Sequence, residues 1–267
     1  MPEGHTIHRL ARDHRTWWQG EPLTLTSPQG RFADGARMLD QRVLEGVDAV
    51  GKHLLYRFGD TTLHVHLGLF GRFRSYRVAP RPGGSVRLRM AGAGRTVDLT
   101  GPTDCALWTH DRVDALLARL GPDPLDPHAD PGRFREALAR RRAPIGAALL
   151  DQAAVAGVGN VYRAELLFLV GQDPRTPARE VEPDVVEALW TEMVRLMPVG
   201  VRVNRIVTTD PATFGKPASR LKRDERLWVY RRRSCRVCAG AVDRLESAGR
   251  TLYWCPACQT RGVRAPG

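Results

Sequence analysis

Two patterns of hydrophobic and polar positions divide the chain. Apolar side chains recur at helical spacing from Ile7 to Trp18, which predicts an amphipathic helix over residues 5–18. Residues 20–118 instead carry short apolar runs separated by Gly and Pro, the pattern of a β-sandwich or barrel. The runs are 22–27, 42–50, 54–58, 62–67, 71–78, 86–90 and 96–99.

The composition changes near residue 120, where four prolines fall between Pro122 and Pro131 and predict an interdomain linker. Asp130 reads as a helix N-cap followed by proline at the first helical position. Helical periodicity then follows over 134–141, 145–152, 161–170 and 184–197, and residues 227–231 are expected to form a short strand. The predicted fold class is α+β with two domains: an N-terminal β-sandwich with flanking helices, and a mainly helical C-terminal domain.

The four cysteines near the C-terminus have the spacing of a zinc site. Cys235-x2-Cys238 is followed after 16 residues by Cys255-x2-Cys258. One structural zinc ion is expected to stabilise a small β-hairpin there, because so short a segment cannot form its own core. Arg250 would lie near the tip of this hairpin. Cys105, the fifth cysteine, is expected to be a buried or incidental thiol.

The charge indicates a polyanionic partner. The net charge is +12, and residues 202–236 alone contain 11 basic and 3 acidic side chains. No apolar run is long enough for a membrane span, and no signal peptide is evident, so a cytoplasmic protein is expected.

Lysine is rare in this chain. Of 41 basic residues only Lys52, Lys216 and Lys222 are lysine. Arginine holds phosphate but does not release its proton, whereas lysine does. Lys52, in a predicted turn between two strands, is therefore a candidate for proton transfer.

Two features follow one another in the predicted sandwich. His64 and His66 alternate with apolar residues on one strand, and phosphate contact or plain exposure is favoured over metal binding because no third ligand is evident. Leu69 and Phe70 come next, between two glycines. They either fold back onto the core or act as wedges between DNA base pairs.

A glycine-rich turn marks the helical part. In Gly157-Val158-Gly159-Asn160 a helix is expected to start at or just after Asn160. Its first backbone N–H groups could bind a phosphate, with Asn160 as an additional donor, although such turns are also routine structural features.

The chain begins Met1-Pro2-Glu3. Removal of Met1 would leave Pro2 with a secondary amine whose pKa is near ~8, so a useful fraction is nucleophilic at neutral pH. Attack of this amine on a sugar C1′ would give an iminium, and Glu3 could move protons beside it.

Taken together, these elements resemble the formamidopyrimidine-DNA glycosylase / endonuclease VIII family. The shared features are Pro2-Glu3, Lys52 on a loop of the sandwich, the Gly157–Glu165 motif of a helix–two-turn–helix, and Arg250 within the four-cysteine hairpin. The start and end of the chain look most like the endonuclease VIII branch in its actinobacterial form. The corresponding domains are residues 1–120, a linker 121–130, a helix–two-turn–helix domain 131–226 and a zinc finger 227–267.

The resemblance implies a base-excision-repair enzyme that is both a DNA glycosylase and an abasic-site lyase, monomeric and acting on damaged double-stranded DNA, with nucleoid-associated activity in a bacterium. It implies Pro2, Glu3, Lys52 and Arg250 as catalytic residues and β,δ-elimination as the outcome. The expected DNA contacts are His66, Leu69, Phe70, Arg119, Gly159 and Asn160.

Two positions depart from the endonuclease VIII pattern, since Gly68 stands where Gln is usual and Phe70 where Tyr is usual. These departures bear on recognition of the base opposite the lesion. Oxidised pyrimidines are the expected lesions, with 8-oxoguanine and formamidopyrimidines as the alternative. An alternative of another class is a non-catalytic zinc-ribbon protein that only binds DNA.

Overall fold

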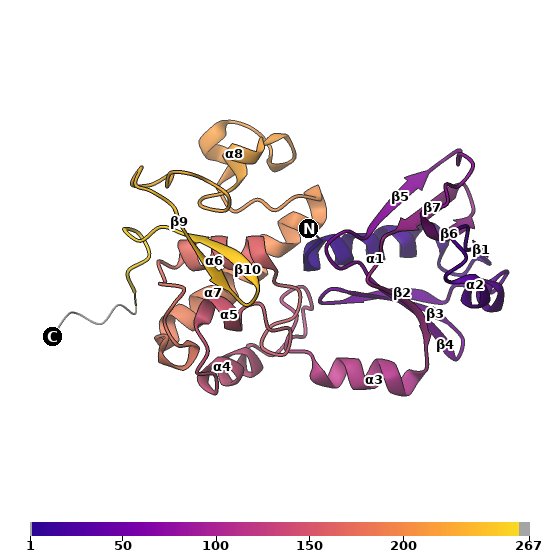
Figure 1. Ribbon diagram of the computed structural model, residues 1–267, viewed down its shortest axis with the longest axis horizontal. Coiled ribbons are helices and arrows are strands. Elements are labelled where there is room, and N and C mark those ends of the chain that lie inside the picture. Colours follow the sequence, from indigo (N-terminus) through magenta and orange to yellow (C-terminus); the bar gives the residue numbers. More distant parts are fainter. Residues whose placement is uncertain (1, 262–267) are drawn as a thin grey trace. The chain divides into compact units, whose positions relative to one another are not determined.

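The computed structural model describes residues 2–261. The chain forms two compact units (Figure 1), which divide in sequence between Arg119 and Leu120. Each unit has its own buried core.

The first unit consists of two sheets and three helices. Its elements are α1 (Gly4–Trp18), β1 (Thr24–Thr26), α2 (Ala33–Leu39), β2 (Gly46–Val50), β3 (His53–Phe58), β4 (Thr61–His66), β5 (Arg72–Tyr76), β6 (Val86–Gly92), β7 (Arg95–Thr100), β8 (Asp104–Trp108) and α3 (His110–Arg119). The seven predicted strands and the first helix are confirmed. The sequence did not predict β8, α2 or α3.

Both sheets of this unit are antiparallel and have four strands, in the orders β1-β6-β7-β5 and β2-β3-β4-β8. One core is shared between them: Leu88 and Val97 from the first sheet pack in the same cluster as Leu54 and Leu63 from the second. The predicted sandwich is therefore correct. Helix α1 lies against β2 and adds its apolar stripe, including Trp18, to the core.

The second unit is mainly helical. Its elements are α4 (Pro131–Ala139), α5 (Ile145–Ala148), α6 (Asn160–Leu169), η1 (Ala178–Glu180), α7 (Pro183–Val203), η2 (Pro211–Phe214), η3 (Ala218–Arg220), α8 (Arg223–Arg226), β9 (Asp243–Ser247) and β10 (Arg250–Trp254). Asp130 caps α4 as expected, since its carboxylate accepts a hydrogen bond from the Gly132 N–H at 2.7 Å. Within the described residues no helix is long and apolar enough to cross a membrane.

One expected element is absent, because residues 227–231 do not form a strand. The backbone N–H groups of Trp228, Val229 and Tyr230 donate to the carboxylate of Glu165, at 2.7–2.9 Å, instead of to a neighbouring strand. A buried side chain on α6 thus replaces the strand partner that an apolar run would otherwise require.

The core of the first unit contains a polar pair. The hydroxyl of Tyr56 lies 2.7 Å from Nδ1 of His14, and both residues are buried. Burial lowers the pKa of His14 to about 4, and burial lowers the pKa of His5, also in α1, to about 3. Both imidazoles are therefore neutral in the folded protein at neutral pH.

Because His5 and His14 are buried as neutral imidazoles, we expect the folded protein to lose stability in acid. Their folded-state pKa values lie below the ordinary 6.5, so the unfolded chain binds protons first as the pH falls. Their stabilising contribution is complete above pH 6.5 and is lost as the pH falls toward 4, by up to about 1.4 kcal/mol per pH unit for each histidine. Urea unfolding at pH 7.5, 6 and 5 measures this slope. The unfolding free energy of a His14→Asn variant should depend less steeply on pH than that of the wild-type protein. His110 lies at an exposed position, and His110→Gln should keep the wild-type pH dependence. Equal stability at pH 7.5 and pH 5 would contradict the assignment.

Candidate functional site

The start of the chain places an acid at a helix N-terminus. Glu3 is fully buried and is the N-cap of α1, where its backbone carbonyl accepts from the Thr6 N–H at 2.8 Å. The positive end of the helix dipole favours a negative charge at this position. Pro2, directly before it, is half-buried. Met1, whose removal the sequence predicts, lies outside the described residues.

Lys52 lies in the turn that joins β2 to β3, where Gly51 has a positive φ of 57°. The strand pairing puts His53 directly opposite His66, and their ring centroids are 4.9 Å apart. Burial lowers the pKa of both histidines, and the positive charge of Lys52 lowers it further. Arg119, at the end of α3, also lowers the pKa of His53. The fold therefore brings Lys52, His66 and Arg119, three residues singled out from the sequence, to one region.

The strand face that carries His64 and His66 is not simply solvent-exposed. Only 2% of His64 is exposed, because α3 packs against β4 and the Trp108 ring stacks on the imidazole with centroids 3.7 Å apart. The expectation of plain exposure is wrong for His64, whereas His66 is half-buried.

Leu69 and Phe70 lie on the loop between β4 and β5, and they do not fold back onto the core. Their exposed fractions are 48% and 83%. The loop is closed by a hydrogen bond from the Gly71 N–H to the Leu67 carbonyl at 2.9 Å. Gly68 has a φ of +63°, and a Cβ there would lie 1.9 Å from Oγ1 of Thr103. The backbone of this loop thus explains why glycine occupies the position.

In the second unit, Asn160 begins α6 as predicted, with Gly159 as its N-cap. The Asn160 amide donates to the Thr251 carbonyl at 2.9 Å, and its oxygen accepts from Arg163 at 2.6 Å. The fully buried Arg163 guanidinium also donates to the carbonyls of Gly146 and Arg250. Asn160 and Arg250 are therefore fixed to one another through Arg163, which the sequence analysis did not single out.

Arg250 follows the tight turn of the β9–β10 hairpin. It pairs with Ser247 across the hairpin, and the two turn residues Ala248 and Gly249 both have positive φ, at 53° and 68°. That conformation is typical of the two-residue turns that match strand twist. The expected place of Arg250 near the hairpin tip is correct.

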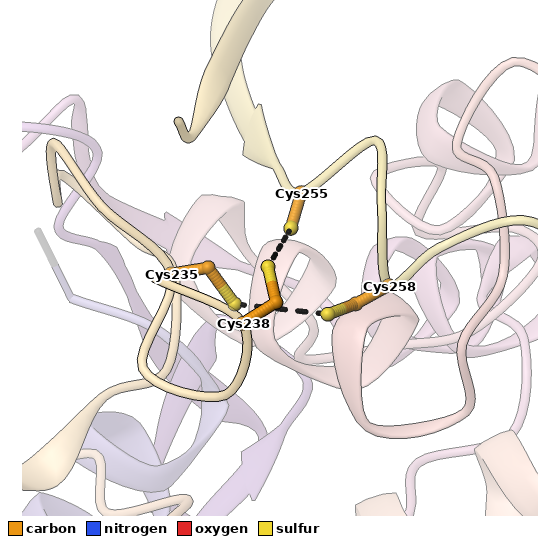
Figure 2. A group of neighbouring side chains, drawn as sticks. All are labelled: Cys235, Cys238, Cys255 and Cys258. Atoms are coloured by element: carbon orange, nitrogen blue, oxygen red, sulfur yellow. Dashed lines mark hydrogen bonds between the residues drawn. The ribbon is translucent and has the colours of Figure 1, made fainter. Parts of the chain in front are cut away.

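The four cysteines converge from two separate turns (Figure 2). All four Sγ atoms lie within 4.8 Å of one another, with Cys235 to Cys258 at 3.8 Å and Cys238 to Cys255 at 3.5 Å. A tetrahedral zinc with Zn–S bonds of about 2.3 Å would separate its sulfurs by about 3.8 Å. The thiol set and its spacing therefore fit a metal. Within residues 2–261, no other group of three or more His, Cys, Asp or Glu residues is arranged in this way.

Cys105 is separate from this cluster. It is buried in the sandwich, and burial raises the pKa of its thiol to about 12. A thiol with this pKa stays protonated and unreactive, as expected for a buried thiol.

Comparisons with known proteins agree with the geometry. The formamidopyrimidine-DNA glycosylase N-terminal domain matches residues 1–117, and the formamidopyrimidine-DNA glycosylase H2TH domain matches residues 120–212. Endonuclease 8 1 of Mycobacterium tuberculosis (strain ATCC 25618 / H37Rv) is 45% identical over 97% of this chain and 100% of its own length. A formamidopyrimidine-DNA glycosylase of Laribacter hongkongensis (strain HLHK9) is 32% identical over 97% of this chain and 98% of its own.

Solved structures support the fold. The structure of MutM in complex with carbocyclic 8-oxo-G containing DNA has a TM-score of 0.80 at 23% identity, covering 97% of this chain and 100% of that one. By the two domain matches and the 45% identity to Endonuclease 8 1, the chain belongs to the formamidopyrimidine-DNA glycosylase / endonuclease VIII family, in its endonuclease VIII branch. The enzyme class expected from the sequence, a DNA glycosylase with abasic-site lyase activity, is confirmed at the level of the family.

Glu165 provides a test of how the second unit is held together. Its two carboxylate oxygens accept four hydrogen bonds, from Thr208 and from three backbone N–H groups. In Glu165→Gln an amide N–H faces these donors, so unfolding free energy should fall by about 1–3 kcal/mol. Glu187→Gln is the matched control, because it removes only an exposed ion pair with Arg135. Urea unfolding measures both variants, and equal stabilities would contradict this role.

Proposed function

We propose that this protein removes oxidised pyrimidines from double-stranded DNA and cleaves the strand through a covalent intermediate on Pro2. The observation that carries the proposal is the fully buried carboxyl of Glu3 directly after Pro2, in a member of this glycosylase family. A secondary amine beside a buried acid has the two functions that the reaction requires, a nucleophile and a proton donor.

The proposed reaction begins with the damaged nucleotide flipped out of the duplex, because C1′ is inaccessible within the base stack. The Pro2 amine attacks C1′ and the glycosidic bond breaks, which releases the base and leaves Pro2 bonded to C1′. The proton that the amine loses passes to Glu3, which gives it to the ring oxygen; the C1′–O4′ bond then breaks, the sugar opens and a positively charged iminium forms. Lys52 then takes the C2′ proton, and the 3′ phosphate leaves in β-elimination.

Arg250 is proposed to bind a phosphate beside the lesion and to support the δ-elimination that follows. Arg163 fixes the hairpin that carries Arg250 to α6, and this attachment favours a defined position for the Arg250 guanidinium. Gly159 and Asn160 would hold backbone phosphate near Arg250, and His66 and Arg119 would do so near Lys52.

The exposed loop residues Leu69 and Phe70 are the proposed wedge that fills the space left by the flipped nucleotide. Two bulky apolar side chains at a loop tip are otherwise unfavourable in water.

The greater sequence similarity to the endonuclease VIII branch supports oxidised pyrimidines as the lesions that this protein removes. Identity is 45% to the relative named Endonuclease 8 1 and 32% to the one named formamidopyrimidine-DNA glycosylase. A preference for 8-oxoguanine and formamidopyrimidines is the second candidate.

The decisive experiment is borohydride trapping on duplexes containing thymine glycol, dihydrouracil, 8-oxoguanine or an abasic site. Borohydride reduces an iminium to a stable amine, so a covalent protein–DNA band requires attack by an amine. The band should be strongest on pyrimidine lesions and should vanish in Pro2→Gly, while duplex binding persists. Unchanged trapping in Pro2→Gly would overturn the role of Pro2. An absence of trapping with intact DNA binding would favour the non-catalytic DNA-binding alternative.

We also propose that the four-cysteine cluster holds one structural zinc ion. The cysteines would contribute four thiolates, and the bound metal would supply the energy that folds the segment around the β9–β10 hairpin. Removal of zinc by a chelator should unfold this segment and abolish DNA binding. The measurements are zinc content, with one ion per chain expected, and fluorescence anisotropy of labelled duplex. Full binding by zinc-free protein would contradict the proposal.

A further inference from the structure

The basic segment 202–236 carries more positive charge than its own acids balance. Its three acidic residues are Asp210, Asp224 and Glu225. Two of these carboxylates are already engaged. Asp210 caps η2, and the two oxygens of Glu225 accept from Lys216 Nζ and from the Lys222 N–H. Most of the positive charge of the segment is therefore unbalanced.

Three arginines of this segment lie close together. Arg223 and Arg226 are the first and last residues of α8, three residues apart and thus on one face, and Arg205 follows α7. Burial lowers the pKa of Arg226, and the positive charges of Arg205 and Arg223 lower it further. Among residues 2–261, no carboxylate is ion-paired to any of the three guanidiniums. The cluster repels itself and lacks a negative charge.

Arg226 is held in place with one N–H group left over. Its Nη1 donates to the Ile206 carbonyl at 3.2 Å, and its own carbonyl accepts from the Thr208 N–H at 2.9 Å. Its Nε is buried and has no hydrogen-bond partner among the described residues. A buried donor without an acceptor costs free energy, and the Nε and Nη donors of a guanidinium form a fork that matches phosphate oxygens.

The other two arginines border the same helix. Arg205 Nη1 donates to the Ser219 carbonyl at 3.3 Å. Arg223 is exposed and lines a cavity of about 540 Å³ together with Tyr230 and residues 231–233. This cavity has room for a phosphate group and the sugars attached to it beside Arg223.

Contacts on both sides hold α8 in place. The Asp224 carbonyl accepts from Arg232 Nη1 at 2.8 Å and from Arg236 Nη1. The Arg236 guanidinium also lies over the rings of Phe214, at 4.9 Å, and Trp228, at 6.0 Å. Helix α8 is thus attached to η2 and to the start of the four-cysteine element. A ligand that binds there has little chain to order, which favours affinity.

We propose that Arg205, Arg223 and Arg226 form one binding site for a phosphate group of the DNA backbone. The inference rests on the proposed action on double-stranded DNA. The site is separate from the phosphate contacts proposed above, none of which uses these residues. A phosphate contact carries no base sequence, so the site contributes equally to binding of damaged and undamaged DNA.

The salt dependence of duplex binding tests whether the arginines share one phosphate. Each phosphate that a protein neutralises adds about 0.9 to the slope of log Kd against log salt, or about eightfold in Kd between about 1 M and about 0.1 M salt. The Arg223→Gln/Arg226→Gln double variant should lose this slope and this factor, equally on undamaged and abasic-site duplexes. Fluorescence anisotropy measures both quantities. An unchanged slope would overturn the site, and a loss of about 1.8 would mean two separate contacts and overturn the shared site.

Arg135→Gln is the matched control for the single variant Arg223→Gln, because each removes one positive charge from the second unit. The Arg135 side chain is 54% exposed and ion-paired to Glu187 at 2.9 Å. The control should keep the wild-type slope and Kd. An equal loss of binding in Arg135→Gln and Arg223→Gln would show that net charge governs binding, and would overturn the site.

The stability of Arg223→Gln separates a binding site from a structural role. Arg223 is exposed and repels Arg226, so in chloride and without DNA the variant should unfold at the same or a higher urea concentration than the wild-type protein. Lower stability together with weaker DNA binding would assign Arg223 a structural role and overturn the proposal.

Nitrogen-15 NMR of the arginine Nε–H groups identifies the ligand. The Arg226 signal is assigned by its loss in Arg226→Gln. Undamaged duplex should shift this signal, and inorganic phosphate should shift it only at much higher concentration. A shift with phosphate and none with duplex would assign the site to a free anion and overturn the DNA contact, and no shift with either would overturn the site. These measurements require no base removal, so a failure of borohydride trapping would overturn the covalent mechanism and leave them unaffected.

Discussion

The second unit depends on one buried charge. The Arg163 guanidinium is fully buried, and burying an ion costs several kcal/mol unless its donors are satisfied. Carbonyls of Gly146, Ser247 and Arg250 and the side-chain oxygen of Asn160 accept from it. These acceptors belong to α5, α6 and the ends of β9 and β10 on either side of the hairpin turn. An isolated two-stranded hairpin is only marginally stable, so this charge gives a small element a definite orientation on a helix.

Glu165, two residues further along α6, accepts hydrogen bonds where Arg163 donates them. Arg163 donates to carbonyl groups, whereas Glu165 accepts from the N–H groups of Trp228, Val229 and Tyr230, in the segment before the first cysteine of the cluster. A single helix therefore anchors the chain that enters the four-cysteine element and the hairpin within it. The proposed zinc ion would hold the element together internally, and α6 positions it. The proposed phosphate contacts of Asn160 and Arg250 depend on both.

Features with a strict period or spacing could be predicted from the sequence. The strands of the sandwich are short apolar runs separated by Gly and Pro, and the four cysteines have a metal-site spacing, so the sandwich and the convergence of the cysteines were correctly inferred. The strand expected over 227–231 was wrong because three of its N–H groups bond to Glu165, 63 to 65 residues earlier in sequence. The contact between His64 and Asp104 could not be predicted from the sequence either, because β8 was not predicted and strand order is set by long-range pairing. Single-residue signals such as Pro2-Glu3 became informative only through the family resemblance.

The turn of the β9–β10 hairpin has a consequence for how this protein can vary. Successive side chains of a strand point to opposite faces, so a one-residue change in turn length would move Arg250 to the other face of the hairpin. Ala248 and Gly249 fix that length at two residues with a backbone suited to it. Substitutions that tolerate positive φ preserve the direction of the guanidinium, whereas an insertion or deletion reverses it. In this turn, chain length is therefore constrained more tightly than residue identity.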